Sequence, residues 1–356
     1  MGATSSALWL ALLIGGFAFS ALLVLAALRY SSTQGLLDQP GVRRSHGKVT
    51  ARGGGIGVVI AFLAGLKVLA LFAMVPVKSA WGLAVGLILV AGIGYVDDHR
   101  PQSVSRRLVV HALASVLFTI SMQGIPQSGW QWLMSIISVI VVMTAINFSN
   151  FMDGSNGMLT IQTMALAAVL MLLAIVAGNV PLALLAALLV ATAAGFLPFN
   201  FPQAQIFLGD VGSGAMGFLI AALGLHAFVD GSINGWLLLA LSSALWLDPG
   251  LTLSMRILSR RRWMSAHRSH LYQWLLRSGW SHPQVAYLYL AWTLLFAVPV
   301  VLISMAGWLP ELAAFAAVLG SGTALWVGAR LGLRRQMRRQ APLSLARSTT
   351  PARTPD

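Results

Sequence analysis

Long apolar runs, separated by short polar breaks, dominate the pattern of this 356-residue chain. A bilayer core needs about 20 apolar residues per helix. Eleven runs reach or approach that length, and they cover residues 7–29, 53–75, 79–96, 107–123, 131–147, 158–177, 181–197, 212–229, 234–256, 284–305 and 311–332. They are continuously apolar rather than alternating, which indicates helices instead of a transmembrane β-barrel. The pattern predicts an all-α, polytopic integral membrane protein.

Composition supports the same class of protein. Hydrophobic residues make up 58% of the chain and charged residues 9%, whereas a soluble domain carries about 25% charged residues. The chain has no cysteine, so disulfides and zinc–thiolate sites are excluded.

The cations predict the orientation. If the N-terminus is outside, the inner segments are 30–52, 97–106, 148–157, 198–211, 257–283 and the tail from 333. Of the 23 Lys and Arg residues, only Lys67 and Lys78 fail to fall in or beside these segments. Cytoplasmic segments carry the excess of Lys and Arg. We therefore expect a periplasmic N-terminus, eleven crossings and a cytoplasmic C-terminus.

The domain organisation follows from this topology. Residues 1–333 are expected to form a single multi-span catalytic domain, and residues 334–356 a basic cytoplasmic tail that is disordered. The net charge of +14 suits the anionic inner leaflet.

The rare acidic residues gather on the predicted inner side. The whole chain has nine of them, and inner breaks hold Asp38, Asp97, Asp98, Asp153 and Asp210. A transporter would need polar groups in mid-membrane. Polar groups on one side favour an enzyme at the cytosolic surface, with one substrate in the lipid and one in water. Carboxylates among many cations predict a metal and phosphate site.

Two of the polar segments combine acids with cations. Asp38 is followed by Arg43, His46 and the glycine run 53–55, which opens a helix whose N–H groups attract anions; the alternative is an ordinary basic loop. Asp97 and Asp98 are adjacent carboxylates that repel each other unless a cation lies beside them, and Mg2+ suits such oxygen ligands. Alternatively, Arg106 and Arg107 neutralise these acids.

Two further segments are rich in amides and glycines. Asn147, Asn150 and Asp153 recur every third residue, so a continuing helix places them along one face. The following glycines, 154 and 157, end that helix or let the backbone approach a ligand. Asp210 lies in a glycine-rich turn that opens a helix, where carboxylate and N–H groups can hold metal and phosphate. Small residues at 213, 214 and 217 could instead serve only helix packing.

The last segments hold His267, Arg268 and His270, a donor-rich patch that suits phosphate or sugar recognition better than zinc. A plain basic loop is the alternative. Asp248 lies about two turns inside the ninth run, with Arg256 on its face. An intramembrane acid indicates function, but a structural pair with Arg256 explains it equally well.

In this order, the segments resemble the polyprenyl-phosphate N-acetylhexosamine-1-phosphate transferase family from about residue 30 to residue 275. The matching motifs are Asp38-x-Pro40…Arg43…His46, Asp97-Asp98, Asn147-x-x-Asn150-x-x-Asp153-Gly154 and Gly209-Asp210-x-Gly212-Ser213. The loop 267–270 looks like the O-antigen branch rather than the peptidoglycan branch. Ala51 departs from a proline frequent in the family, and Asn156 from an aspartate of the peptidoglycan branch.

The resemblance implies a reaction and its setting. Undecaprenyl phosphate would attack a UDP-N-acetylamino sugar at the cytoplasmic face of the bacterial inner membrane, release UMP and start O-antigen or cell-envelope polysaccharide synthesis. It implies Mg2+ as cofactor, with Mn2+ as a substitute, a possible homodimer and no nucleic-acid partner. The alternatives are a lipid-phosphate carrier and a non-catalytic protein of the same fold.

The resemblance also assigns roles to residues. It implies a metal at Asp210 and Asp98, and catalytic roles for Asp97, Asp98 and Asp153. The substrate-binding residues that it implies are Asn147, Asn150, Asn156, Phe207, Arg43, His46, Arg106, His267, Arg268 and His270. Among these, Phe207 would stack on uracil, as aromatic side chains do on bases.

Overall fold

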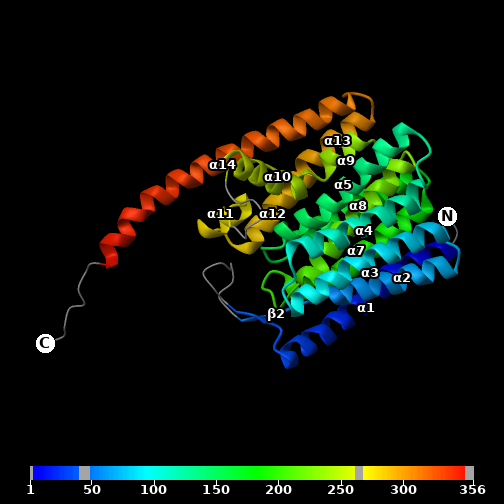
Figure 1. Cartoon of the computed structure of the whole chain (residues 1–356), viewed down its shortest axis with the longest axis horizontal. Coiled ribbons are helices and arrows are strands. Elements are labelled where there is room, and N and C mark those ends of the chain that lie inside the picture. Colours follow the sequence, from blue (N-terminus) through cyan, green and yellow to red (C-terminus); the bar gives the residue numbers. More distant parts are fainter. Residues whose placement is uncertain (1–2, 40–48, 261–267, 349–356) are drawn as a thin grey trace.

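The computed structural model describes residues 3–39, 49–260 and 268–348. Within these ranges, the chain forms an elongated bundle of helices with a small sheet at one end (Figure 1). The helices are α1 (Ala3–Gln34), α2 (Gly55–Leu71), α3 (Val77–His99), α4 (Val104–Gln123), α5 (Gly129–Met152), α6 (Met158–Val176), α7 (Val180–Asn200), α8 (Gly209–Val229), α9 (Gly235–Leu241), α10 (Ser243–Leu258), α11 (Leu271–Arg277), α12 (His282–Trp292), the π-helical turn η1 (Thr293–Ala297), α13 (Val298–Met305) and α14 (Glu311–Ser348).

Every predicted apolar run is largely helical, and the runs 234–256 and 284–305 are each divided between consecutive helical elements, which confirms the all-α, polytopic class. Nine helices in the described part of the chain are long and apolar enough to cross a membrane, and the bent pair α9 and α10 would make ten. Helix α2 is apolar but shorter, with 17 residues. The number of crossings and the orientation therefore remain predictions.

The run 234–256 differs from the straight helix that its hydropathy predicted. The chain bends by 83° between α9 and α10, at Ser242, whose hydroxyl donates to the carbonyl of Leu238. The bend directs α10 against α5 and α14. Its polar residues Asp248 and Arg256 are thereby buried among protein atoms instead of facing lipid, where charged groups are costly.

Helix α8 lies at the centre of the bundle and packs against α2, α3, α5 and α6. Its small residues allow this crowding: a Cβ atom on Gly55 would lie 2.2 Å from the Cα of Gly212, and one on Gly217 would lie 2.6 Å from the carbonyl oxygen of Ala145. Small residues let membrane helices approach closely. The packing role is therefore the one that the structure supports for Gly212 and Gly217.

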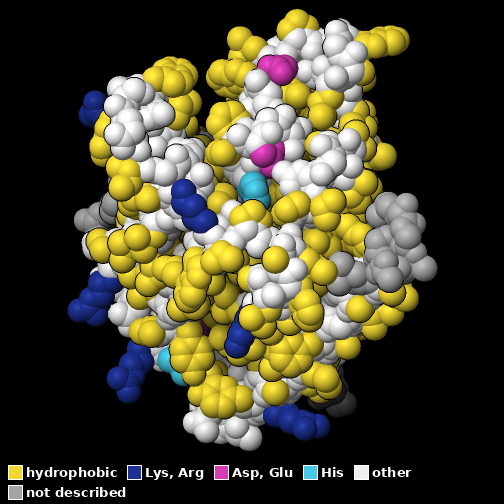
Figure 2. Space-filling view, turned by 90° about the vertical axis from the view of Figure 1, so that its right-hand side faces the viewer, with side chains coloured by type: hydrophobic (Ala, Val, Ile, Leu, Met, Phe, Trp, Pro, Cys, Tyr) yellow, Lys and Arg dark blue, Asp and Glu magenta, His cyan; other side chains and the backbone are white. Residues whose placement is uncertain are grey.

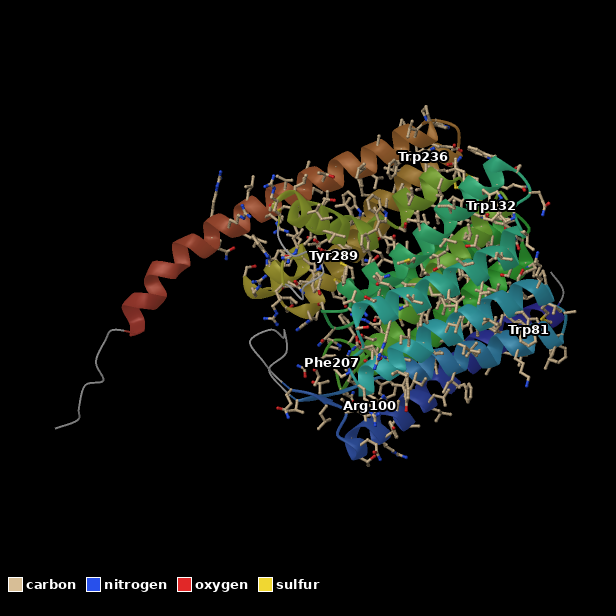
Figure 3. All side chains as sticks on the ribbon, viewed as in Figure 1. Trp81, Arg100, Trp132, Phe207, Trp236 and Tyr289 are labelled. Atoms are coloured by element: carbon tan, nitrogen blue, oxygen red, sulfur yellow. The ribbon has the colours of Figure 1, made fainter. Side chains whose placement is uncertain are left out.

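The two ends of the bundle differ in chemistry. Exposed tryptophans 81, 132 and 236 lie at one end, and Phe207 and Arg100 at the other (Figure 3). The tryptophan end, turned toward the viewer in Figure 2, is covered mostly by hydrophobic and uncharged side chains. Tryptophans concentrate at membrane–water interfaces. This end therefore has the character of an interface without a polar site.

A three-stranded sheet at the opposite end was not predicted. Its strands are β1 (Leu37–Asp38), β2 (Thr50–Arg52) and β3 (Ile206–Phe207), in the order β1-β2-β3, with β1 and β2 antiparallel and β2 and β3 parallel. In the register, Arg52 is paired with Phe207. The sheet brings the start of α2 beside the start of α8, although more than 150 residues separate them.

The glycine run 53–55 has a different role from the predicted one. The backbone N–H groups of Gly53 and Gly54 donate to the carbonyl of Phe207 at 3.1 and 2.9 Å, and that of Gly55 donates to Leu208 at 2.8 Å. These donors hold the two loops together, so the prediction that they bind an anion is wrong for this arrangement.

Helix α14 extends past the other helices at the end of the bundle that carries the sheet (Figure 1). It continues through Ser348, so residues 334–348 are helical where the sequence predicted disorder. Arginine, glutamine, leucine and alanine, which are frequent there, are good helix formers. The predicted disorder of residues 349–356 lies outside the described residues.

Candidate active site

Asp98, at the end of α3, holds the start of α8. Its carboxylate accepts the backbone N–H groups of Asp210 at 2.9 Å and Val211 at 3.1 Å. It also accepts the Nε–H of Arg52 at 2.8 Å, and 4% of its side chain is exposed. Such a carboxylate satisfies N–H donors at a helix N-terminus and suits the helix dipole. Asp98 is thus engaged as a helix cap, which disfavours its predicted role as a metal ligand.

Asp210 is the centre of the polar contacts at this end. One carboxylate oxygen accepts from Arg52 Nη2 at 2.9 Å, and the other accepts from Arg107 Nη1 at 3.2 Å. The same Arg107 nitrogen lies 3.2 Å from Asp97, so Arg107 joins the carboxylates of Asp97 and Asp210. The predicted convergence of Asp97, Asp98 and Asp210, the aspartate cluster, is confirmed.

Of the two arginines that the alternative prediction placed against the acids, Arg107 contacts the cluster and Arg106 does not. Arg106 is exposed and donates to the side-chain oxygen of Gln102, away from the aspartates. Successive helical residues point about 100° apart, so Arg107 occupies the position assigned to Arg106. The sequence assigned no role to Arg52, which directly precedes the glycine run 53–55. Its strand places it against Asp98 and Asp210, a pairing that local sequence does not reveal.

Two glycines permit this geometry. Gly209 has φ +76°, and a Cβ atom there would lie 2.5 Å from an oxygen of Asp98. A Cβ on Gly94 would lie 2.5 Å from the carbonyl oxygen of Asp210. The end of α3 and the start of α8 can therefore touch only because side chains are missing at both positions.

A polar cavity of about 270 Å3 lies beside the cluster. Its lining includes the predicted residues Asn150, Asp153, Asn156, Phe207 and Asp210, which confirms that these segments converge. It also includes three residues to which the sequence gave no site role: Asn200, Gln273 and His282. Asn200 lies far from Gln273 and His282 along the chain, and all three lie far from Asn150. Spacing alone therefore could not group them.

Asp153 caps the C-terminus of α5 and faces the cluster across the polar cavity. Burial raises the pKa of its carboxyl group well above the usual range, and the charge of Asp210 adds to the shift. A carboxyl group in this state can hold a proton at a pH where an exposed aspartate is ionised.

The loop after Asp153 is held from two sides. The backbone N–H of Asn156 donates to His282 Nδ1 at 3.2 Å, and that of Gly157 donates to the side-chain oxygen of Asn200 at 2.7 Å. Because a backbone N–H can only donate, His282 Nδ1 is an acceptor, and the proton of the neutral ring lies on Nε2. His282 and Asn200 thus fix the loop that carries Asn156.

The glycines of this loop allow protein side chains to approach closely. A Cβ atom on Gly154 would lie 2.1 Å from the hydroxyl of Tyr272, and one on Gly157, where φ is +70°, would lie 2.5 Å from the ring of Phe201. Gly154 also lines the polar cavity, so the approach of the backbone to a ligand there stays a prediction.

Other predicted binding residues lie elsewhere. Asn147 bonds back to the carbonyl of Met143 at 2.7 Å and does not line the polar cavity. His270 is 3% exposed and stacks against Phe151 and Tyr272. Arg268 also does not line the cavity. The predictions for Arg43, His46 and His267 lie outside the described residues.

Two further hollows flank the site. One of about 260 Å3 lies on the α1 side of Asp98 and Arg52, with Tyr30, Tyr95 and His99 in its lining. The other is an apolar groove of about 480 Å3, formed by α5, α8, α9 and the start of α10. The apolar groove includes Phe148 and Ser149. These directly precede Asn150 of the polar cavity along α5.

The donor set can be tested for a metal. Among the described residues, no group of three or more His, Cys, Asp or Glu side chains is arranged as a metal site. Mg2+, however, usually takes one or two carboxylates and completes its shell with water and substrate phosphates. Asp97 and Asp210, which share Arg107 as a partner, fit that requirement. Asp98 fits it less well, because its side chain is the least exposed of the three and accepts two backbone N–H groups of α8.

Comparison with known proteins agrees with this arrangement. The sequence model of glycosyl transferase family 4 matches residues 80–227. The chain is 24% identical over 263 residues to a probable undecaprenyl-phosphate N-acetylglucosaminyl 1-phosphate transferase of Bacillus subtilis, which covers 70% of this chain and 72% of the relative. It is 28% identical to a decaprenyl-phosphate N-acetylglucosaminephosphotransferase of Mycobacterium leprae (71% and 73%) and 27% identical to a phospho-N-acetylmuramoyl-pentapeptide-transferase of Symbiobacterium thermophilum (72% and 80%).

An all-helical membrane bundle with aspartates at one end and a family 4 match from α3 to α8 defines a membrane-bound glycosyl transferase. The chain is similar in sequence to polyprenyl-phosphate N-acetylglucosamine-1-phosphate transferases over about 70% of its length.

Proposed function

We propose that the chain transfers an N-acetylamino-sugar 1-phosphate from a UDP-sugar to undecaprenyl phosphate and releases UMP. The names of the relatives support a polyprenyl-phosphate acceptor. The observation that carries the proposal is the aspartate cluster itself. Asp210 lines the polar cavity and is paired with Arg52 and Arg107, and Arg107 also holds Asp97 beside it, so that two phosphates can be brought together there.

The polar cavity suits a nucleotide sugar. Asn150 and Asn156 offer side-chain amides, which can both donate and accept hydrogen bonds. Phe207 offers a ring on which uracil can stack. The Nδ2 of Asn156 lies 3.3 Å from the carbonyl of Pro202, so its amide is oriented before a ligand binds. Preorganised polar groups lower the cost of binding.

Charge explains why a divalent cation is proposed. Asp38, Asp153 and Asp210 line the polar cavity together with the single cation Arg52 among the described residues, and the phosphates of both substrates are anionic. Bound Mg2+ would neutralise developing charge on the transferred phosphate. We propose Asp97 and Asp210 as its ligands, which moves the second ligand from Asp98 to its neighbour. Mn2+ remains the proposed substitute.

The protein residues then act mainly by positioning. A phosphate monoester has a second pKa near 6, so the acceptor is largely dianionic at neutral pH and needs little help from a base. Arg52 and Arg107 hold Asp210 in place from both sides. Asp98 fixes the start of α8 that carries it. Asp153, with its raised pKa, can exchange a proton beside the reacting groups.

The apolar groove is the proposed seat of the polyprenyl chain. Its lining is almost entirely apolar along α5 and α8, and α5 continues from the groove to Asn150 of the polar cavity. A lipid in the groove would therefore present its phosphate toward the cluster. We place the reaction at the cytoplasmic face of the bacterial inner membrane, because Lys and Arg concentrate in the segments at this end. The role in O-antigen or envelope polysaccharide synthesis and the homodimer remain predictions.

The test is transfer by the purified protein in lipid nanodiscs. With undecaprenyl phosphate and Mg2+, a panel of UDP-GlcNAc, UDP-FucNAc and UDP-QuiNAc should give UMP release with at least one sugar, and chelation should abolish it. Asp210→Asn should reduce the rate by at least about 100-fold, as loss of a transition-state contact does.

Asp230→Asn is the matched control, because Asp230 lies in the loop after α8 at the opposite end of that helix. It should retain the rate. A carrier or a non-catalytic protein would release no UMP with any sugar, and this result would overturn the proposal.

A further inference from the structure

Asp248 is a buried carboxylate outside the aspartate cluster, and 3% of it is exposed. Within the described residues, it accepts hydrogen bonds from five donors: the backbone N–H of Leu271 (2.8 Å) and Tyr272 (3.4 Å), the hydroxyls of Tyr289 (3.0 Å) and Thr252 (3.2 Å), and the indole N–H of Trp326 (2.9 Å). A carboxylate has about four lone-pair sites. Its oxygens are therefore saturated.

The donors come from four different helices. Thr252 is on α10, Leu271 and Tyr272 form the first turn of α11, Tyr289 is on α12 (Figure 3), and Trp326 is on α14. Two consecutive N–H groups of one helix start are the arrangement in which a carboxylate fixes a helix N-terminus. Asp248 thus determines where α11 begins, relative to the three longer elements around it.

Arg330 holds the residues just before α11. Its guanidinium donates to the carbonyl of Ser269 at 2.7 Å and lies 4.3 and 4.4 Å from the ring centres of Trp274 and Trp326. The positive charge also lies near Asp248, which reduces the cost of burying a carboxylate. The start of α11 is therefore held from both sides of His270.

α11 in turn forms part of the polar cavity. Gln273 lines that cavity, and its amide is fixed: the oxygen accepts the N–H of His270 at 3.3 Å, and the nitrogen donates to the hydroxyl of Tyr272 at 3.2 Å. The same hydroxyl donates to the carbonyl of Phe151 at 2.9 Å. A shift of α11 would move Gln273 and disturb the segment that carries Asn150 and Asp153.

We infer that Asp248 is a positioning residue for the nucleotide-sugar donor, acting through α11 and Gln273, which contacts the donor directly. The inference rests on the proposed function. Asp248 does not line the polar cavity, so it touches no substrate. Its effect should fall on donor affinity, because the wall formed by Gln273 is displaced while the aspartate cluster stays intact.

The experiment measures KM for the UDP-sugar and for undecaprenyl phosphate, together with kcat, in nanodiscs. Asp248→Asn turns one acceptor oxygen into a donor group facing other donors. It should raise the donor KM by about tenfold or more, as loss of hydrogen bonds to a charged group implies, and leave kcat and the lipid KM within about twofold. Tyr289→Phe removes one donor to Asp248 and should raise the donor KM by a smaller factor.

The link through Gln273 is tested by a double-mutant cycle. Gln273→Ala should raise the donor KM. In the double variant Asp248→Asn, Gln273→Ala, the increase in donor KM should be smaller than the product of the two single increases, because coupled residues are not additive. An increase in the double variant that equals the product of the two single increases would overturn the inference. Equal effects on the donor KM and the lipid KM would overturn it too.

Two further results distinguish a folding defect, and a failure of the proposed function, from a failure of the inference itself. If Asp248→Asn fails to assemble, the cycle is run with Tyr289→Phe in its place. An increase in donor KM of that double variant equal to the product of the single increases would count against the inference. If the wild type releases no UMP, the proposed function fails first. A wild-type protein that transfers normally while Asp248→Asn keeps the wild-type donor KM would reject the inference alone.

Discussion

Asp98 and Asp248 are both almost fully buried carboxylates, and each accepts two consecutive backbone N–H groups at a helix start. Their surroundings differ. Asp98 fixes α8 so that Asp210 faces the polar cavity, whereas Asp248 fixes α11 among packed aromatic side chains. The comparison teaches that a rare acid in this bundle need not touch substrate. The structure uses two of its aspartates to hold helix starts, and Asp97, Asp153 and Asp210 are left to face ligands.

Gly209→Ala should disturb the cap that Asp98 forms on α8 more severely than any other substitution proposed below. The new Cβ would lie 2.5 Å from Asp98, at φ +76°. Backbone strain of this kind costs about 1–3 kcal/mol, and the displaced cap should abolish UMP release. Gly92→Ala is the control, because a Cβ there meets nothing within 4 Å. Equal activity of the two variants would show that the cap is dispensable.

Asp98→Asn and Asp210→Asn distinguish an aspartate that positions a helix start from an aspartate that takes part in the reaction. The amide of Asp98→Asn would face N–H donors, so thermal unfolding should occur at a lower temperature, by roughly 2–4 °C per kcal/mol lost. Asp210→Asn leaves the start of α8 capped by Asp98 and should lower the unfolding temperature less, while it removes at least about 100-fold of the rate. Differential scanning fluorimetry and UMP release measure the two effects. The reverse order of stabilities would contradict the assigned roles.

Arg107→Gln and Arg106→Gln form a matched pair on neighbouring positions of α4. Arg107 contacts Asp97 and Asp210, and Arg106 contacts only Gln102 among the described residues. Arg107→Gln should therefore reduce kcat by about 10- to 100-fold, or about 1.4–2.7 kcal/mol, because this charge pair is partly exposed and its loss costs less than that of a fully buried pair. Arg106→Gln should stay within about twofold. Similar losses in both variants would mean that the general positive charge matters rather than this contact.

The smallest expected effect concerns Asp153 and pH. Its pKa is raised in the folded protein, so the folded state binds more protons than the unfolded state above the usual aspartate pKa. The stability of the wild type therefore falls as pH rises toward the raised value. Asp153→Asn removes this loss, and its unfolding temperature relative to the wild type should rise between pH 4.5 and pH 7.5. A difference that is constant or falls over this range would exclude the shift.

The sequence predicted the helices well and the site in part. Each apolar run became a helix, because bilayer-length apolar segments have few alternatives to helix formation. The convergence of Asp97, Asp98, Asp153 and Asp210 followed from placing charged breaks on one side of the membrane. What these acids hold was not predictable, because Asp98 finds its partners in backbone N–H groups more than 100 residues away.

Three features escaped prediction for physical reasons. The strands have two or three residues, too short for a period-2 pattern to be visible. The bend at Ser242 does not change the mean hydropathy of the run 234–256, so the hydropathy pattern could not reveal it. The burial of His270 depends on α11, whose position is set by Asp248 and Arg330, so a donor-rich segment that suggested a binding loop became part of a packed wall.

The most direct measurement compares Asp210→Asn with Asp248→Asn at saturating UDP-sugar, with undecaprenyl phosphate and Mg2+ held fixed. The account predicts that saturation restores the rate of UMP release in Asp248→Asn to within about twofold of the wild type. Asp210→Asn should stay at or below about 1%. If Asp210→Asn recovers at high donor concentration, or if Asp248→Asn does not, the division between reacting and holding aspartates is contradicted.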